Sequence, residues 1–274
     1  MKKLLGSIIF LVMTLPLQGM NVSQLKTLIG HTEFISAIAW RPDGTMIVTG
    51  SSDTTAIIWD VETGKQLGQL TGHTGPITSV AWCRNDRIVT SSFDERIARI
   101  WGPPGQVIHQ LHHPMSVRAV ACLPDGRIVT GGGDGIVRIW DTNGQEEMRL
   151  IGHTEPVNDI AVNDDGSLIL TGSLDNTARV WDAGTGEELL RLEDDDLWRV
   201  AWCQNRIVTG TLAGGIKIWK AANGEEVLSI NNNGNSVNAV ACSQDGSQFS
   251  QELTLVLKYG IQILGKARRS SDTI

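Results

Sequence analysis

The chain has 274 residues, of which 41% are hydrophobic and 19% are charged, so it is long enough to bury a sizeable core. Its formal net charge of −7 argues against a general affinity for nucleic acid, because that affinity needs an excess of Lys and Arg. The 30 Gly indicate many turns, and 9 Trp against 1 Tyr suggest one Trp in each copy of a repeated unit.

The first 19 residues resemble a secretory signal peptide, because two lysines precede an apolar run and Gly19 offers a small-residue cleavage site. The apolar run, Leu4 to Leu17, is shorter than the about 20 residues that cross a membrane as a helix. We therefore predict a signal peptide over residues 1–19, export to the periplasm or the medium, and no membrane span in the mature chain. The alternative is a cytoplasmic protein whose apolar N-terminus is a strand or helix of the fold.

From residue 24 onward the sequence repeats itself with a period of roughly 40 residues. Each unit holds an apolar run such as "ISAIAW", then a phrase such as "IVTGSSD", then a phrase that ends on Trp, such as "TTAIIWD". Turn sequences such as "RPDG" and "ETGK" separate these phrases, since Pro and Asp favour turns and Gly takes the left-handed position. The sequence of each unit therefore predicts four short antiparallel strands. Five units share the tryptophan: Trp59, Trp101, Trp140, Trp181 and Trp219.

One small sheet cannot bury both of its faces, so neighbouring units are expected to stack as the blades of a β-propeller. The dipeptides "GH" and "WD", with an Asp between them, recur in order over about residues 24 to 250. This pattern resembles the WD-repeat family. We accordingly predict an all-β fold, with a propeller domain over residues 20–250 that contains five full four-stranded antiparallel blades and a partial sixth.

The sixth unit begins with "NSVNAVACSQDGSQFS" and then departs from the repeat. We predict that residues 251–274 are a divergent C-terminal tail, such as a frameshift would produce, and a degenerate third strand is the alternative. The propeller then either closes as a six-blade ring or stays open. An open ring would leave an edge that invites pairing with another chain.

A histidine, a serine and an aspartate in one unit raise the question of a catalytic triad. The set recurs in a second unit with identical spacing, and two triads in one small domain would be unusual. A buried hydrogen-bond network in each blade explains the recurrence better, because buried His and Asp must be paired. In the WD-repeat family these positions form such a structural tetrad. The predicted tetrads are His31, Ser51, Asp53 and Trp59, and His153, Ser173, Asp175 and Trp181.

The other units are less regular. The second keeps His73, Asp94 and Trp101 with one extra residue between Asp and Trp, and the third keeps His113, Asp134 and Trp140 with Gly132 in place of Ser. In the fifth unit Glu193 and Ala213 replace His and Asp. We therefore expect the network to be absent from the fifth blade and that blade to be looser.

The four cysteines occupy nearly equivalent positions on the first strands of different units: Cys83, Cys122, Cys203 and Cys242. Packed sheets lie about 10 Å apart, whereas a disulfide needs Cα atoms within about 7 Å. We therefore expect all four to be small buried hydrophobes without disulfides. They form no cluster of the kind that binds a metal.

The sequence offers no catalytic residue, cofactor site or metal site, and the resemblance implies a non-enzymatic scaffold that binds a peptide or protein on the propeller rim. An enzyme built on a propeller and a truncated or decayed copy without independent function are the alternatives. The acidic run "EDDD" beside Trp198 suggests a basic or Arg-containing peptide ligand, although such a run is more often a solvated loop. The predicted partner-binding residues are Phe34, Phe93, Arg118, Trp198 and Asp196.

Overall fold

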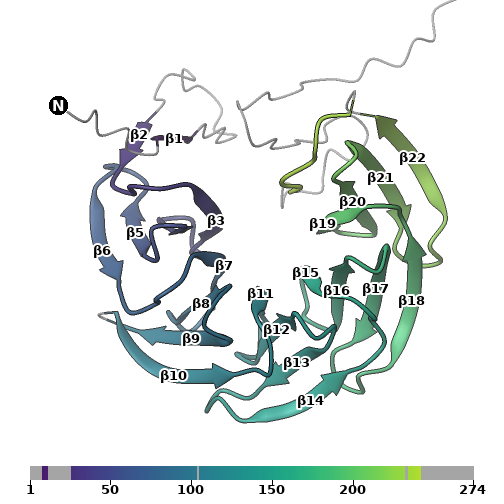
Figure 1. Cartoon of the computed structure of the whole chain (residues 1–274), viewed down its shortest axis with the longest axis horizontal. Helices are drawn as coiled ribbons and strands as arrows, with labels where there is room; N and C mark the ends of the chain where they lie inside the picture. Colours follow the sequence, from purple (N-terminus) through teal and green to yellow (C-terminus); the bar gives the residue numbers. More distant parts are fainter. Residues whose placement is uncertain (1–7, 12–25, 104, 232–233, 242–274) are drawn as a thin grey trace, which may run out of the picture. The chain divides into compact units, whose positions relative to one another are not determined.

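The computed structural model describes residues 8–11, 26–103, 105–231 and 234–241. Every regular element in these ranges is a strand, and five of the sheets have four antiparallel strands each (Figure 1). We call these sheets blades 1 to 5 in chain order. The prediction of an all-β fold built from four-stranded antiparallel blades is confirmed.

The chain divides into two compact units. The first contains residues 1–133 and 138–147, and the second contains residues 134–137 and 148–274. The boundary passes through blade 3, whose sheet contains β11 (Val117–Cys122), β12 (Ile128–Gly132), β13 (Val137–Trp140) and β14 (Glu146–Leu150).

The first unit also holds blades 1 and 2. Blade 1 contains β3 (Ile35–Trp40), β4 (Met46–Ser51), β5 (Ala56–Asp60) and β6 (Gln66–Leu70). Blade 2 contains β7 (Ile77–Trp82), β8 (Ile88–Ser92), β9 (Ile97–Gly102) and β10 (Gln106–His112).

The second unit holds blades 4 and 5. Blade 4 contains β15 (Val157–Val162), β16 (Leu168–Ser173), β17 (Thr177–Asp182) and β18 (Glu188–Glu193). Blade 5 contains β19 (Leu197–Cys203), β20 (Arg206–Thr211), β21 (Gly215–Lys220) and β22 (Glu226–Asn231).

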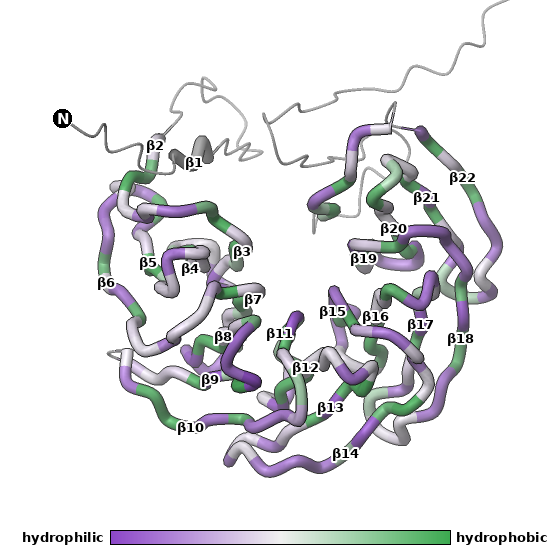
Figure 2. Tube along the Cα trace, in the orientation of Figure 1, coloured by the Kyte–Doolittle hydropathy of each residue, from purple (hydrophilic) through white to green (hydrophobic). Residues whose placement is uncertain are grey.

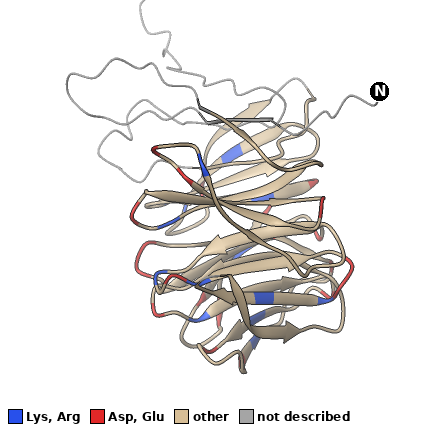
Figure 3. Ribbon diagram, turned by 90° about the vertical axis from the view of Figure 1, so that its left-hand side faces the viewer, with Lys and Arg blue, Asp and Glu red and all other residues tan. Residues whose placement is uncertain are grey.

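Each blade has two ends, set by the pairing of its first two strands. The start of the first strand lies beside the end of the second, as in the pair Leu197 and Thr211, and we call this the entry end. The end of the first strand lies beside the start of the second, as in the pair Cys203 and Arg206, and we call this the turn end. Acidic residues lie mostly in the turns that connect the strands (Figure 3).

The first strand of every blade contains a β-bulge near its start, for example between Ile77 and Ser79. The extra residue shifts the alternation, so that Ile77 and Val80 both turn toward blade 1. A Cβ added at Gly50 of β4 would lie 2.5 Å from Ile77 Cγ2 and 2.8 Å from Val80 Cγ1. The glycine is therefore required for close packing between blades 1 and 2.

The cores lie between successive blades and repeat the same pattern. One cluster joins Val48, Ala56 and Leu70 of blade 1 to first-strand and second-strand residues of blade 2. Equivalent clusters join blade 2 to blade 3 and blade 4 to blade 5. Hydrophobic and polar segments alternate along the chain of each blade (Figure 2). Burying one such aliphatic side chain stabilises the fold by about 1.5–3 kcal/mol.

Blades 1 and 5, the first and last in the chain, differ in whether the sheet face without a neighbouring blade is covered. Val237 and Val240 pack on blade 5 as the first strand of a following unit would, and Val237 is fully buried. Ile38 of blade 1, by contrast, is 46% exposed, whereas its counterpart Val80 is 7% exposed. The remainder of the predicted sixth blade and the predicted tail over residues 251–274 lie outside the described residues.

The prediction that the cysteines form no disulfides is wrong in both units. Cys83 and Cys122 form a disulfide with a Cα–Cα distance of 5.4 Å. The 10 Å spacing of packed sheets does not apply here, because the first strands of blades 2 and 3 come within hydrogen-bonding range. Thr78 Oγ1 donates to the carbonyl of Val117 at 3.0 Å. Cys203 is also disulfide-bonded, and Cys242 lies outside the described residues.

Part of the predicted signal peptide is described. Residues 8–11 form β1 (Ile8–Leu11), which pairs antiparallel with β2 (Lys26–Ile29). The pairing matches the alternative in which the apolar N-terminus is a strand, and cleavage after Gly19 stays a prediction. Among the described residues, no helix is long and apolar enough to cross a membrane.

Candidate functional site

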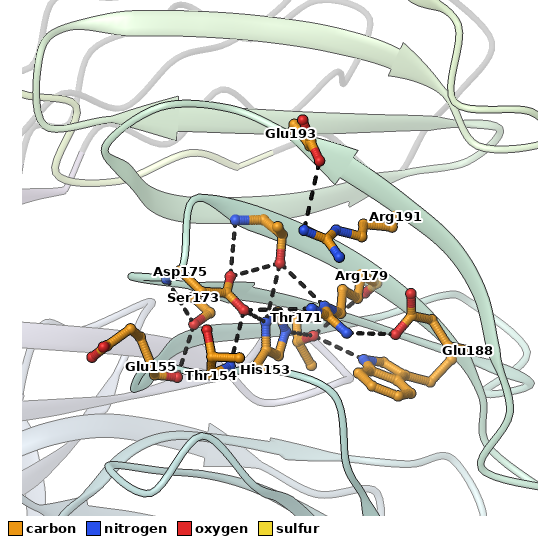
Figure 4. A network of polar contacts seen from close by, with 12 residues as sticks. His153, Thr154, Glu155, Thr171, Ser173, Asp175, Arg179, Glu188, Arg191 and Glu193 are labelled. Atoms are coloured by element: carbon orange, nitrogen blue, oxygen red, sulfur yellow. Dashed lines mark hydrogen bonds and ion pairs between the residues drawn. The ribbon is translucent and has the colours of Figure 1, made fainter.

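A buried chain of polar contacts crosses blade 4 (Figure 4). His153 Nδ1 lies 2.9 Å from Asp175 Oδ2, and His153 Nε2 lies 2.7 Å from Thr171 Oγ1. The indole N–H of Trp181 donates to the same threonine oxygen at 2.9 Å. This geometry fits a neutral imidazole that donates from Nδ1 and accepts at Nε2 from the threonine hydroxyl. We call it the Trp–Thr network.

Burial and charge together fix the protonation of this network. Burial lowers the pKa of His153, and the nearby Asp175 only partly opposes that shift. Burial would raise the pKa of Asp175, but hydrogen bonds from Thr177 and His153 outweigh it and hold this pKa below its usual value. The arrangement therefore pairs a carboxylate with an imidazole that burial keeps neutral.

Ser173 does not contact His153 or Trp181 in the hydrogen bonds of this network, although the sequence predicted it as a member of the tetrad. Its hydroxyl donates to the carbonyl of Glu155 at 2.9 Å and accepts from the N–H of Asp175 at 3.2 Å. Thr171, which the sequence reasoning missed, links histidine to tryptophan instead. Both hydroxyls are completely buried, so neither presents a nucleophile to a substrate.

Blade 1 repeats the arrangement. His31 contacts Asp53 and Thr49 at 2.8 Å each, and Trp59 donates to Thr49 at 2.8 Å. Ser51 again bonds to backbone groups: it donates to the carbonyl of Glu33 at 3.2 Å and accepts from the N–H of Asp53 at 3.1 Å. In both predicted tetrads the structure brings His, Asp and Trp together through Thr rather than Ser.

In blade 2 the acidic partner is Glu95 rather than the predicted Asp94. His73 Nδ1 lies 2.5 Å from Glu95 Oε2, and Arg99 contacts both groups. Counting back from the tryptophan would have found it, because Glu95 precedes Trp101 by six residues, as Asp53 precedes Trp59. In blade 3, His113 and Trp140 both contact Thr130, at 2.8 and 2.9 Å.

The expected loss of the network in blade 5 is also wrong. Thr209 donates to Asp194 at 2.5 Å and accepts from Trp219 at 2.9 Å. Asp194 is 4% exposed and pairs with Lys217 at 2.8 Å. An aspartate of the "EDDD" run thus replaces the histidine, with a lysine as its counter-charge.

The predicted partner-binding residues lie at the entry ends of their own blades. Phe34 is 65% and Phe93 is 46% exposed. Arg118 of blade 3 lies against Phe93, with its Cζ 5.3 Å from the ring centre. The structure thus joins Phe93 and Arg118 in a cation–π pair.

Trp198 and Asp196 lie in the second unit. Trp198 is half-buried, and Asp196 is exposed in the turn before β19. The Cζ atom of Arg199 lies 4.9 Å from the centre of the Trp198 ring, a contact that the sequence reasoning missed. Among the described residues, no three His, Cys, Asp or Glu side chains are grouped as metal ligands would be.

Comparison with known proteins agrees with the fold. The family described as "IFT122 first beta-propeller" matches residues 17–249. The chain therefore belongs to the WD-repeat β-propeller family.

Several curated relatives match parts of the chain. RACK1 of Caenorhabditis elegans, a small ribosomal subunit protein, is 40% identical over 180 residues, which are 63% of this chain and 55% of that protein. The WD repeat-containing protein 26 homolog of Arabidopsis thaliana is 26% identical over 154 residues, 55% of this chain and 19% of that protein. One component of chromatin assembly factor 1 from Mus musculus is 43% identical over 47 residues, 17% of this chain and 8% of that protein. The chain thus spans about half or less of these relatives.

Proposed function

We propose that the protein is a non-enzymatic interaction module that binds a peptide or protein partner at the entry ends of its blades. The observation that carries this proposal is the pair of Phe93 and Arg118, an exposed aromatic ring with a guanidinium against it. Phe and the other aromatic residues are enriched in protein interfaces, and Arg is enriched among the few residues that dominate their binding energy. Phe34 adds a second exposed ring at the entry end of blade 1.

The family relationship supports the same proposal. Two relatives carry the names of components of larger assemblies, a small ribosomal subunit and a chromatin assembly factor. The buried hydroxyls of the Trp–Thr networks favour a scaffold over a hydrolase, because a nucleophile must reach its substrate.

Trp198 and Asp196 are proposed to contact a basic residue of the partner. Arg199 already lies over the Trp198 ring, so a partner arginine would compete with it there. The carboxylate of Asp196 is exposed. We therefore expect Asp196 to contribute more than Trp198 to selection of a basic partner.

The test is a selection of peptides from a random phage-displayed library on the wild-type protein, followed by fluorescence anisotropy with the selected peptide. We expect Phe93→Ala and Arg118→Ala each to weaken binding about tenfold or more, as for interface hot spots. Leu67→Ala is the matched control, because Leu67 is 52% exposed on the fourth strand of blade 1, away from the entry ends. Equal losses in all three variants would contradict the proposal.

A truncated or decayed copy without independent function is the competing hypothesis. The repeated cores between blades support a folded module instead. A cooperative melting transition of the purified chain is expected. A gradual, non-cooperative loss of signal would favour the decayed copy.

A further inference from the structure

A groove opens at the turn end of blades 4 and 5, at the opposite end of these sheets from Trp198. Its volume is about 460 Å³. Leu168, Trp202 and Ala221 line it, and all three pack at the margin of the core between these blades. The groove therefore has an apolar floor in which the indole of Trp202 is partly exposed.

Two carboxylates stand at the groove. Asp164 and Asp165 are exposed residues of the turn between β15 and β16. Hydrogen bonds from the hydroxyl and the N–H of Ser167 hold the pKa of Asp165 below its usual value. Asp165 is therefore an anion at neutral pH. The turn presents negative charge above an aromatic floor.

The junction of blades 1 and 2 shows what this chain places in the corresponding position. Arg41 is the first residue after β3, as Asn163 is the first residue after β15. The guanidinium of Arg41 lies 3.1 Å from Asp43, the counterpart of Asp165, and donates twice to Asp86 at 2.8 Å. The junction of blades 1 and 2 thus holds the side chain of Arg41. The junction of blades 4 and 5 has the shorter side chain of Asn163 at that position, and the groove lies beside it.

We propose that the groove at the turn end of blades 4 and 5 binds an arginine side chain of a basic partner segment. The guanidinium pairs with Asp164 and Asp165 and stacks on the ring of Trp202. The aliphatic stem of the arginine covers Leu168 and Ala221. This site is separate from the entry-end residues and does not depend on the function proposed for them.

The experiment follows the indole N–H of Trp202 by ¹H–¹⁵N correlation spectroscopy while acetylated, amidated hexaarginine is added. The Trp202→Phe variant assigns the signal. We expect a saturable shift of the Trp202 signal with hexaarginine and none with hexaglutamate. Asp164→Asn should weaken the binding about two- to fivefold, the range for an exposed ion pair. Glu62→Gln removes the same charge from an exposed turn of blade 1 and should leave the affinity unchanged.

The second variant, Asn163→Arg, fills the groove from within, as Arg41 fills the other junction. It should abolish the Trp202 shift. The change also removes the bonds that the Asn163 side chain makes with the N–H of Leu168 and the hydroxyl of Ser167, so the melting temperature is expected to fall somewhat and is measured beside the shift. The proposal is overturned if Trp202 does not respond, or if Glu62→Gln weakens binding as much as Asp164→Asn, which would indicate only general attraction to an acidic protein. If Asn163→Arg does not fold, the comparison of the hexaarginine affinities of Asp164→Asn and Glu62→Gln decides whether the proposal stands.

Discussion

A threonine hydroxyl accepts the indole N–H in all five blades. In four blades the same hydroxyl contacts a histidine, and in blade 5 it donates to Asp194. A buried indole N–H without a partner would cost about 1–3 kcal/mol, so each threonine hydroxyl removes a substantial penalty from the burial of its tryptophan. The five threonines are Thr49, Thr90, Thr130, Thr171 and Thr209.

Thr171→Val tests this role, because valine keeps the shape and removes the hydroxyl. The change leaves Trp181 Nε1 and His153 Nε2 unpaired, so we expect unfolding free energy to fall by about 2–4 kcal/mol. Ser173→Ala should cost only about 1 kcal/mol, since its partners are backbone groups at the strand end. Urea unfolding measures both. A larger loss in Ser173→Ala would show that the serine is the central hydroxyl.

Glu95 gives the fold a dependence on pH. Burial would raise its pKa, but hydrogen bonds from Arg99, His73 and Thr74 outweigh it and lower the pKa from 4.5 to about 2. A carboxylate with a depressed pKa stabilises the fold fully above pH 4.5, and this contribution is lost as the pH falls toward 2. We expect the urea midpoint of the wild type to fall between pH 5 and pH 3 more steeply than that of Glu95→Gln. The exposed Glu62→Gln should follow the wild type.

In blades 1 and 4 the histidine, aspartate and tryptophan could be predicted because they recur at fixed spacing, whereas the acid of blade 2 and the substitute for histidine in blade 5 could not. The choice between Thr171 and Ser173 could not, because it depends on strand register. Trp181 pairs across the sheet with Ile169, so Thr171 is the next residue on the same face, and Ser173 lies two residues further along. Hairpin geometry sets that register, and the repeat pattern alone does not reveal it.

At the scale of the element, the strands and turns followed from sequence alternation and turn residues. The first-strand bulge did not, because it inserts one residue without a sequence signal of its own. Asp194 was missed for a related reason. His153 lies four residues before the first strand of blade 4, whereas Asp194 lies three residues before β19, so counting back four residues from β19 aligned Glu193 with His153. Loop length therefore limited the prediction more than strand pattern did.

Gly50→Ala tests the packing that the bulge creates. The new methyl group would overlap Ile77 and Val80, so we expect a loss of about 1–3 kcal/mol in unfolding free energy. Gly68→Ala in the same blade is the control, because its nearest neighbour would be Ile58 Cδ1 at 3.8 Å, an ordinary contact. Thermal unfolding of the two variants should separate them clearly. Equal stability would show that blade 1 can move away from blade 2 at little cost.

At the scale of the whole molecule, the repeat predicted the family and the blade pattern, but not the pairing of the cysteines. Sheet spacing gave the wrong distance, because first strands of adjacent blades come closer than packed sheet faces do. The disulfide is typical of proteins that fold in an oxidising compartment. Export would suit such a bond, whereas the pairing of β1 with β2 matches the alternative, so export stays a prediction.

The cross-link between Cys83 and Cys122 should contribute measurably to stability. It closes a loop with a sequence separation of 39, for which loop entropy predicts about 4 kcal/mol. We expect Cys83→Ala/Cys122→Ala to melt lower than the wild type under oxidising conditions. The wild type should approach the variant after reduction with dithiothreitol. An unchanged melting temperature in the double variant would contradict a stabilising role.

The same bond changes what a protease can release. Arg96 is exposed in the turn between β8 and β9, inside the segment that the two cysteines enclose. A single tryptic cut after Arg96 would break the backbone, yet the two pieces would remain one covalent molecule. They would migrate together on a denaturing gel without reductant and separate only when a thiol is added.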